Sequence, residues 1–268
     1  MDAITTHGMH MPKLGLGTWK MKGAACTAAV GHALSIGYRH IDTAEMYGNE
    51  AEVGAALGGV PRADVHVTSK VWYEHLAPDA MDRAIDATLA RLGTSYVDLY
   101  LIHWPAPGMD MAVAIGALRA VQESGRARAI GVSNFTVALL NEACALAPIA
   151  CNQVEYHVLL DQTPLLAACR MHKVALAAYA PLAQGRLAEH EELAAIAHKH
   201  SATPAQVALK WLLDQDSVCA IPEAERPATQ AANLDAMRIT LDDTDRAVIA
   251  MLPKARRFVQ PGWAPLWD

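Results

Sequence analysis

The chain has 268 residues, of which 53% are hydrophobic and 19% are charged, with a net charge of −6 and an isoelectric point near 6.0. This balance excludes a basic face for nucleic acid or anionic lipid. No run approaches the roughly 20 apolar residues of a membrane span, and the N-terminal segment lacks the cationic and apolar parts of a secretory leader. We therefore expect a cytoplasmic protein with a large core and no nucleic-acid or membrane partner.

Short apolar runs alternate with longer Ala- and Leu-rich stretches, which is the pattern of repeated βα units. A hairpin is expected first, at residues 4–11. Eight strands are expected after it, at residues 14–18, 40–43, 65–69, 97–103, 129–133, 150–154, 175–179 and 218–221. Helices are expected at residues 27–36, 79–92, 112–124, 137–145, 164–172, 191–200 and 204–214. No linker or composition break divides this pattern, so we predict one α/β domain over residues 1–268.

Cysteine and histidine spacing predicts no metal site. The five cysteines are an odd number, form no C-x-x-C pair and mostly stand in Ala-rich or apolar contexts, so we expect buried free thiols. His198 and His200 are two residues apart, the wrong separation for one helix face, and we predict surface polar residues there.

Polar residues stand at the C-terminal ends of three successive expected strands, where parallel barrels build active sites. Asp42 and His103 each end a strand, and Lys70 lies at or near the end of the strand between them. A buried ammonium needs a carboxylate, so we predict an Asp42–Lys70 pair. Tyr47 follows Asp42 by five residues. Each residue alone also fits an ordinary structural role, but together the four indicate an active site.

The strings IDTAEMYGNE, TSKVW and LIHWP around these residues resemble the aldo-keto reductase superfamily, and the resemblance runs from Lys13 to Asp268. The short segment after His103 and the ending PGWAPLWD are most similar to the bacterial branch that contains 2,5-diketogluconate reductase B. The resemblance implies a single (β/α)8 TIM barrel with an N-terminal β-hairpin and extra helices near the C-terminus. It also implies a monomer that reduces a small-molecule carbonyl with NADPH or NADH.

Hydride transfer to a carbonyl leaves negative charge on its oxygen, so the site needs a proton donor and electrostatic support there. We assign Tyr47 as the donor, because the neighbouring Lys70 ammonium should lower the phenol pKa from its usual value of about 10. Asp42 would keep Lys70 charged and oriented. Neutral His103 would hydrogen-bond the substrate oxygen.

The chain has no G-x-G-x-x-G motif, which agrees with a barrel that binds its cofactor without a Rossmann domain. By resemblance, Ser133, Asn134 and Gln153 hydrogen-bond the nicotinamide carboxamide, and Tyr179 stacks on the ring. The expected cofactor site also includes residues near the pyrophosphate and the adenosine, namely Gly17, Thr18, Leu182, Gln184, Gly185, Ile221, Pro222, Glu223, Arg226 and Asn233.

The eighth strand departs from NADPH-using relatives, which commonly follow its Ile-Pro with Lys-Ser and place an Arg further on. Here Glu223 and Ala224 follow, and Thr229 takes the Arg position. A carboxylate repels a 2′-phosphate but accepts a hydrogen bond from a free ribose hydroxyl. We therefore expect NADH to be used comparably with NADPH or preferred. Two alternatives remain: Glu223 points into solvent, or Arg226, at the start of the expected last helix, binds the phosphate.

Trp19, Trp72 and Trp104 flank strand ends and Trp267 lies in the C-terminal tail, so we assign these four to an apolar substrate pocket. No cationic cluster is apparent beside them, and no long insertion follows His103. We predict that methylglyoxal and simple aromatic aldehydes are better substrates than long or anionic sugars such as 2,5-diketogluconate.

Two other functions fit parts of the pattern. A sensor or structural barrel would bind the cofactor without turnover, and the intact set of four residues argues against it. A barrel hydrolase or lyase would use Asp42 and Glu45 as an acid–base pair, which no sugar-binding or metal cluster supports.

Overall fold

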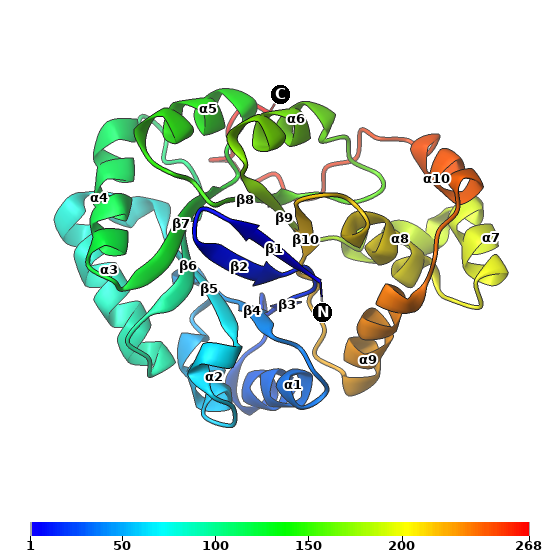
Figure 1. Cartoon of the computed structure of the whole chain (residues 1–268), viewed down its shortest axis with the longest axis horizontal. Coiled ribbons are helices and arrows are strands. Elements are labelled where there is room, and N and C mark those ends of the chain that lie inside the picture. The colour runs from blue at the N-terminus through cyan, green and yellow to red at the C-terminus, as the bar shows by residue number, and fades with distance from the viewer. Residues whose placement is uncertain (1, 268) are drawn as a thin grey trace.

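The chain forms an eight-stranded parallel barrel surrounded by helices, in a computed structural model that describes residues 2–267 (Figure 1). Neighbouring strands follow chain order, and the barrel closes where Gly15 N donates to Ala220 O at 2.9 Å and Gly17 N donates to Pro222 O at 3.1 Å. The predicted (β/α)8 fold is confirmed. The strands are β3 (Leu16–Gly17), β4 (His40–Asp42), β5 (His66–Val71), β6 (Val97–Ile102), β7 (Ala127–Ser133), β8 (Cys151–Glu155), β9 (Ala175–Tyr179) and β10 (Val218–Ala220).

Helices form the outer layer of the barrel (Figure 1). They are α1 (Gly23–Ser35), α2 (Glu50–Leu57), α3 (Pro78–Leu92), α4 (Met111–Glu123), α5 (Val137–Leu146), α6 (Thr163–His172), α7 (Glu191–Lys199), α8 (Pro204–Leu213), α9 (Pro227–Asp235) and α10 (Asp243–Ala250). The last two are the extra helices expected near the C-terminus. Arg226 directly precedes α9, which is not the last helix, because α10 follows it.

Helix α2 has no counterpart among the helices expected from the sequence. Three glycines, one inside the helix and two just after it, weaken its local helical propensity. Tertiary contacts stabilise it instead: the buried Glu50 carboxylate accepts from Ser69 Oγ at 2.5 Å and from Arg91 Nε at 2.7 Å. Gly54 lets α2 approach α3, since a Cβ there would lie 2.6 Å from Leu92 O.

The predicted N-terminal hairpin forms from β1 (Ala3–Thr6) and β2 (Met9–Pro12), and it lies across one end of the barrel (Figure 1). It covers the N-terminal end of the strands, because the buried His40 and His66 rings each place Nδ1 3.1 Å from a carbonyl oxygen of β2, that of Pro12 and that of His10. Carbonyl oxygens only accept, so both Nδ1 atoms donate. Because the hairpin covers the N-terminal end of the strands, their C-terminal end is the open end of the barrel.

The expected surface histidines differ from each other. His198 is exposed, but His200 is half-buried and its Nε2 lies 2.7 Å from Asp245 Oδ2 of α10. The prediction for His200 was wrong because α10 folds back against α7 and supplies a carboxylate that is distant in sequence. The cysteines are free thiols as expected, four of them buried and Cys144 half-buried.

Candidate active site

Four polar residues meet inside the C-terminal end of the barrel. Asp42 ends β4, Lys70 lies within β5, and His103 directly follows β6. Tyr47 ends a short 3-10 helix, Glu45–Tyr47, which turns the chain back over β4. The sequence predicted that these four lie together, and the structure brings them together.

Lys70 is the centre of this cluster. Its side chain is fully buried, and its Nζ lies 2.6 Å from Asp42 Oδ1, 2.8 Å from Thr43 O and 3.3 Å from the Tyr47 hydroxyl. Three partners match the three N–H groups of an ammonium. The predicted Asp42–Lys70 pair is therefore formed, and it extends to the tyrosine.

The second oxygen of Asp42 has a partner that the sequence did not indicate. Gln153, in the middle of β8, donates through Nε2 to Asp42 Oδ2 at 2.7 Å. We had assigned Gln153 only to the nicotinamide. This contact makes both carboxylate oxygens hydrogen-bonded, which a buried carboxylate requires.

The pKa of Tyr47 differs from the sequence-based expectation. Burial and the Asp42 carboxylate raise it well above its ordinary value, whereas we predicted that Lys70 would lower it. The physical reason is that burial disfavours the charged phenolate, and the Asp42 carboxylate disfavours it further. Tyr47 therefore keeps its proton near neutral pH, which is the form that a proton donor needs.

The two basic groups of the cluster also respond to burial. Burial lowers the pKa of Lys70, and the adjacent Asp42 opposes that shift. Burial and then the charge of Lys70 lower the pKa of His103 well below its ordinary value, so the imidazole is neutral, as predicted. Its Nδ1 is buried and has no hydrogen-bond partner among residues 2–267. That nitrogen is not used in a structural hydrogen bond.

The residues assigned to the nicotinamide form a connected network beside this cluster. Asn134, with a left-handed φ of 64°, donates through Nδ2 to His103 O at 3.0 Å and accepts at Oδ1 from the Tyr179 hydroxyl at 2.7 Å. Ser133 Oγ donates to Gln153 O at 2.7 Å. The Tyr179 ring is thus held by its hydroxyl.

The segment assigned to the pyrophosphate follows β9 and has an unusual backbone. Ala183, Gln184 and Gly185 have φ values of 49°, 51° and 86°. A glycine in such a left-handed turn lets the backbone approach another group closely. Leu182 precedes the turn, and its carbonyl accepts from Gly185 N at 3.0 Å. This loop fits a phosphate-binding role.

The first strand contributes closely packed backbone, as the glycines predicted. A Cβ on Gly17 would lie 2.7 Å from Ile221 O. Gly17 therefore packs against the backbone that follows β10, where the barrel closes. Thr18 is buried and its Oγ1 donates to Asp42 O at 2.9 Å.

The segment after β10 contains the residues that differ from those of NADPH-using relatives. Ile221 and Pro222 are buried, whereas Glu223 and Arg226 are exposed. Partial desolvation and the neighbouring Glu225 raise the pKa of Glu223, and Lys20 opposes the shift. Asn233 is buried in α9, on the same side of the barrel.

Aromatic rings line the mouth above the cluster. The Trp19 ring lies 4.8 Å from Tyr47, and Trp72 lies 5.4 Å from His103. Trp263 of the C-terminal tail lies 5.9 Å from Trp72. Trp104 is buried, and its ring lies 6.2 Å from that of Trp267. By resemblance, the tail that carries Trp263 and Trp267 closes over the mouth, and Trp263 is linked to His103 through the Trp72 ring.

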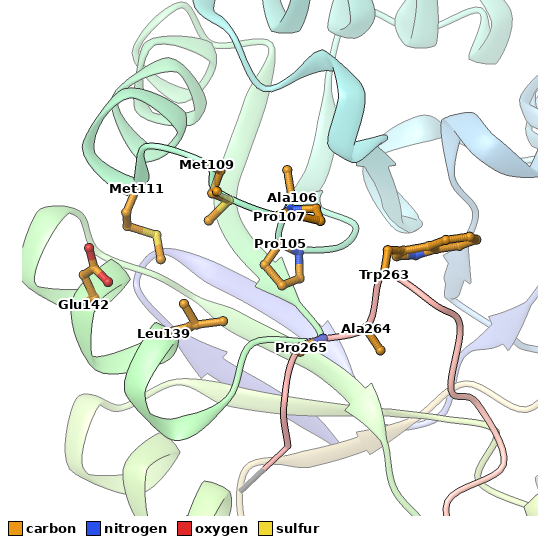
Figure 2. Close-up of a pocket in the computed structure, with 11 residues that line it drawn as sticks. Pro105, Ala106, Pro107, Met109, Met111, Leu139, Glu142, Trp263, Ala264 and Pro265 are labelled. Carbon is orange, nitrogen blue, oxygen red and sulfur yellow. The ribbon is translucent and has the colours of Figure 1, made fainter.

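A cavity of about 290 Å³ opens beside the tail, between Trp263 and the segment that follows β6 (Figure 2). Pro105, Met109 and Leu139 are among its lining residues, and none of the four clustered residues lines it. It adds apolar space next to the mouth.

A guanidinium lies beside one of the tryptophans in the C-terminal tail. The Arg257 guanidinium carbon is 3.7 Å from the centre of the Trp267 ring. Its Nη1 is also 3.9 Å from the buried Glu155 carboxylate. The tail had offered no sequence signal for this contact, because it depends on how the chain returns over the barrel after α10.

Glu45 does not form an acid–base pair with Asp42. Its two oxygens accept from Trp72 N at 2.9 Å and lie 2.9 Å from His75 Nδ1. Within residues 2–267, no cluster of three or more His, Cys, Asp or Glu side chains could hold a metal ion. No helix in this part of the chain is both long and apolar enough to cross a membrane.

The barrel and the cluster at its C-terminal end define a reductase of the aldo-keto type. Residues 13–252 match the aldo/keto reductase family, and the chain belongs to it and is an oxidoreductase. Methylglyoxal reductase DkgB of Escherichia coli O157:H7 is 40% identical over 268 residues, covering 97% of this chain and 100% of that protein. An aldo-keto reductase of Mycolicibacterium smegmatis is 39% identical, covering 94% of this chain and 93% of that protein.

Solved structures agree with this assignment. The crystal structure of a protein proposed to be 2,5-diketo-D-gluconic acid reductase B has a TM-score of 0.96 at 42% identity, covering 100% of this chain and 98% of that chain. The thermostable aldo-keto reductase Tm1743, bound to the inhibitor epalrestat, has a TM-score of 0.89 at 38% identity, covering 93% and 99%. The predicted family and its bacterial branch are confirmed.

Proposed function

We propose that this protein reduces small aldehydes and ketones to alcohols by hydride transfer from NADPH or NADH, with Tyr47 as general acid. The observation that carries the proposal is the position of Lys70 Nζ, 2.6 Å from Asp42 Oδ1 and 3.3 Å from the Tyr47 hydroxyl. One buried cation links a carboxylate to a protonated phenol. Carbonyl reduction needs such a proton donor with electrostatic support behind it.

When bound, the nicotinamide supplies a hydride to the carbonyl carbon. The Tyr47 hydroxyl donates its proton to the carbonyl oxygen, where negative charge develops. The Lys70 ammonium then stabilises the phenolate that remains, and Asp42 keeps Lys70 oriented. His103 is neutral and donates a hydrogen bond from its ring N–H to the same substrate oxygen.

Residues around the C-terminal ends of β7, β8 and β9 fit a nicotinamide cofactor. Tyr179 offers a ring fixed by its hydrogen bond to Asn134, and Ser133 and Gln153 lie in the same network. The backbone at Gln184 and Gly185 would pass beside the pyrophosphate, and Gly185, which has no side chain, would allow a close approach. These residues would orient the cofactor toward Tyr47.

We further infer that NADH is used comparably with NADPH or preferred. Glu223 and Glu225 give the segment after β10 two exposed carboxylates where relatives with a 2′-phosphate site carry a cation. Arg226 and Lys20 are the cations near this segment that oppose the inference. A phosphate would have to bind between like charges, which weakens it.

We infer that the substrate is a small uncharged carbonyl compound and that the enzyme acts as a cytoplasmic monomer. The rings of Trp19 and Trp72 make the mouth apolar, and Arg257 is mostly buried beside Glu155. Its charge is therefore largely compensated before any anionic substrate arrives. Relatives named methylglyoxal reductase support the same substrate class.

The direct test is steady-state reduction of methylglyoxal, benzaldehyde and 2,5-diketogluconate with each cofactor. We expect turnover of the first two to exceed that of the sugar acid. If no carbonyl is reduced but either nucleotide quenches tryptophan fluorescence, the sensor function is favoured. Absence of both responses would contradict the reductase and the sensor alike.

A further inference from the structure

The last residue of β8, Glu155, has a buried carboxylate that the proposed chemistry does not use. Its side chain is fully buried, and Oε1 accepts from Phe258 N at 2.7 Å while Oε2 accepts from Val259 N at 2.9 Å. Both donors are backbone groups of the C-terminal tail. A carboxylate with backbone N–H partners on both oxygens is a strong, charge-assisted anchor.

A histidine two residues later completes the anchor. His157 is also fully buried, and its Nε2 lies 3.0 Å from Glu155 Oε1. Leu159 N donates to His157 Nδ1 at 3.3 Å, so Nδ1 accepts and the ring proton is on Nε2. His157 therefore donates to Glu155 and fixes the orientation of its carboxyl group.

The loop after β8 holds the preceding part of the tail by its backbone. Arg256 N donates to Leu159 O at 2.9 Å, and Asp161 N donates to Lys254 O at 2.8 Å. Leu160 and Ala255 form an isolated antiparallel bridge. The tail is thus tied down through Val259, directly above the end of β8.

Beyond Val259 the tail has less support from packing. Two cavities of about 290 Å³ are lined by tail residues, one by Trp263 and Pro265 and the other by Arg257 and Trp267. Figure 2 shows Trp263 projecting from this tail across from the segment that follows β6. The position of Trp263, 5.9 Å from Trp72, therefore depends on where the anchor starts the tail.

We propose that Glu155 is a positioning residue that sets the preference for bulky aromatic carbonyl substrates, by fixing the tail that places Trp263 over the mouth. The inference rests on the proposed carbonyl reduction. Glu155 points from the same face of β8 as Gln153, two residues earlier, which holds Asp42. One strand thus orients the catalytic cluster with one side chain and the substrate-facing tail with the next.

The test compares Glu155→Gln with the parent on methylglyoxal and on 2-naphthaldehyde. In the variant an amide nitrogen faces one of the two tail N–H groups, so the anchor is lost without loss of volume. We expect KM for 2-naphthaldehyde to rise about tenfold or more, as for a lost charge-assisted bond, with kcat/KM for methylglyoxal within about twofold. Trypsin should also cleave after Arg256 and Arg257 faster in the variant.

The matched control is Glu189→Gln. Glu189 makes an ion pair with Arg256 of the same segment, at 3.6 Å, but both side chains are exposed. We expect this change to leave KM and tryptic cleavage near their parental values, within about twofold. If Glu189→Gln acts like Glu155→Gln, charge near the tail rather than the buried anchor is responsible, and the proposal is overturned.

Two further variants keep the proposal testable if Glu155→Gln folds poorly. Val259→Pro removes one tail N–H donor and leaves Glu155 in place, and should give the same pattern. Adding Glu155→Gln or Val259→Pro to Trp263→Ala should raise KM for 2-naphthaldehyde by no more than about twofold, because the anchor acts through Trp263. Additive effects, or unchanged cleavage and unchanged KM, would overturn the inference. Tryptic cleavage reports on the anchor even if the parent reduces no carbonyl, so failure of the proposed function is a separate outcome.

Discussion

Lys70 illustrates at the scale of single residues how a buried charge is kept in this barrel. Its three hydrogen-bond partners come from Asp42, Thr43 and Tyr47, and Gln153 satisfies the remaining oxygen of Asp42. These side chains form a closed hydrogen-bond network in which each side chain has a defined orientation. Removing one member leaves another unpaired, so residue-scale substitutions here should have large effects.

Replacing Tyr47 with Phe removes the proposed proton donor and keeps the aromatic ring. We expect carbonyl reduction to fall by at least about a hundredfold, the lower end of what a positioned general acid contributes, with cofactor binding retained. Stopped-flow or steady-state turnover and a nucleotide titration of tryptophan fluorescence measure the two effects. Tyr96→Phe is the control, since Tyr96 packs between Arg62 and Arg128. Retained activity in Tyr47→Phe would contradict the assignment of Tyr47 as the general acid.

Replacing Lys70 with Met should damage both turnover and stability, because Asp42 is left buried without its cation. Breaking a buried pair in this way typically costs about 3 to 5 kcal/mol. Lys210→Met is the control, since Lys210 pairs with Asp214 on α8 near the surface and should cost about 1 kcal/mol or less. Urea unfolding measures both. Equal losses of unfolding free energy in the two variants would mean that burial does not increase the contribution of the Asp42–Lys70 pair to stability.

At the scale of elements, we propose that the junction of β10 and α9 decides the choice of cofactor. A 2′-phosphate loses about three hydrogen bonds when Glu223, Ala224 and Thr229 replace the residues of NADPH-using relatives, enough to weaken NADPH binding about tenfold or more. We expect Glu223→Lys to tighten NADPH and leave NADH less affected. Dissociation constants for both cofactors in the parent, in Glu223→Lys and in Arg226→Ala provide the measurement. A strong parental preference for NADPH that only Arg226→Ala removes would refute the role given to Glu223.

Helix α2 should depend on its glycine through packing. In Gly54→Ala the new Cβ would meet Leu92 O at 2.6 Å, a contact with backbone that cannot yield cheaply. We expect a loss of about 1 to 3 kcal/mol in the free energy of unfolding. Gly116→Ala in α4 is the matched control, because nothing lies within 4 Å of its Cβ position, and it should stabilise the protein by about 0.5 to 1 kcal/mol. Thermal unfolding that ranks the two variants in the opposite order would contradict the close α2–α3 approach.

At the scale of the whole molecule, buried histidines link stability to pH. Burial lowers the pKa of His66 and of His103 well below their ordinary values, and it lowers that of His40 as well. In the unfolded chain each takes up a proton as the pH falls through about 6.5, but in the folded chain it does not. The unfolded state then binds more protons, so stability is complete above that pH and is lost as the pH falls toward the folded-state values.

We expect His66 and His103 each to contribute about 2 kcal/mol of destabilisation between pH 7 and pH 5. Urea unfolding at a series of pH values measures this slope. His66→Gln should make the slope shallower, whereas the exposed His198→Gln should leave it unchanged. A His66→Gln slope equal to that of the parent would show that carboxyl groups, not buried histidines, control acid stability.

The sequence by itself determined the barrel and the identity of the residues at its open end. Alternation of strands and helices requires parallel strands, and parallel strands place Asp42, Lys70 and His103 at the same end. The resemblance to the aldo-keto reductases implied that the repeated units close into a single barrel. The same local reasoning missed α2, because the contacts of Glu50 and Gly54 that stabilise it come from β5 and α3.

Only the tertiary structure decided which side chains meet across long separations. Gln153 reaches Asp42 across 111 residues, and Glu155 reaches Phe258 across 103. Neither partner is signalled by spacing or composition. The direction of the Tyr47 pKa shift also depends on how fully Asp42 and Lys70 neutralise each other, which is a matter of distances and burial. Electrostatic energies and tail contacts follow from these distances, so residue types in chain order could not supply them.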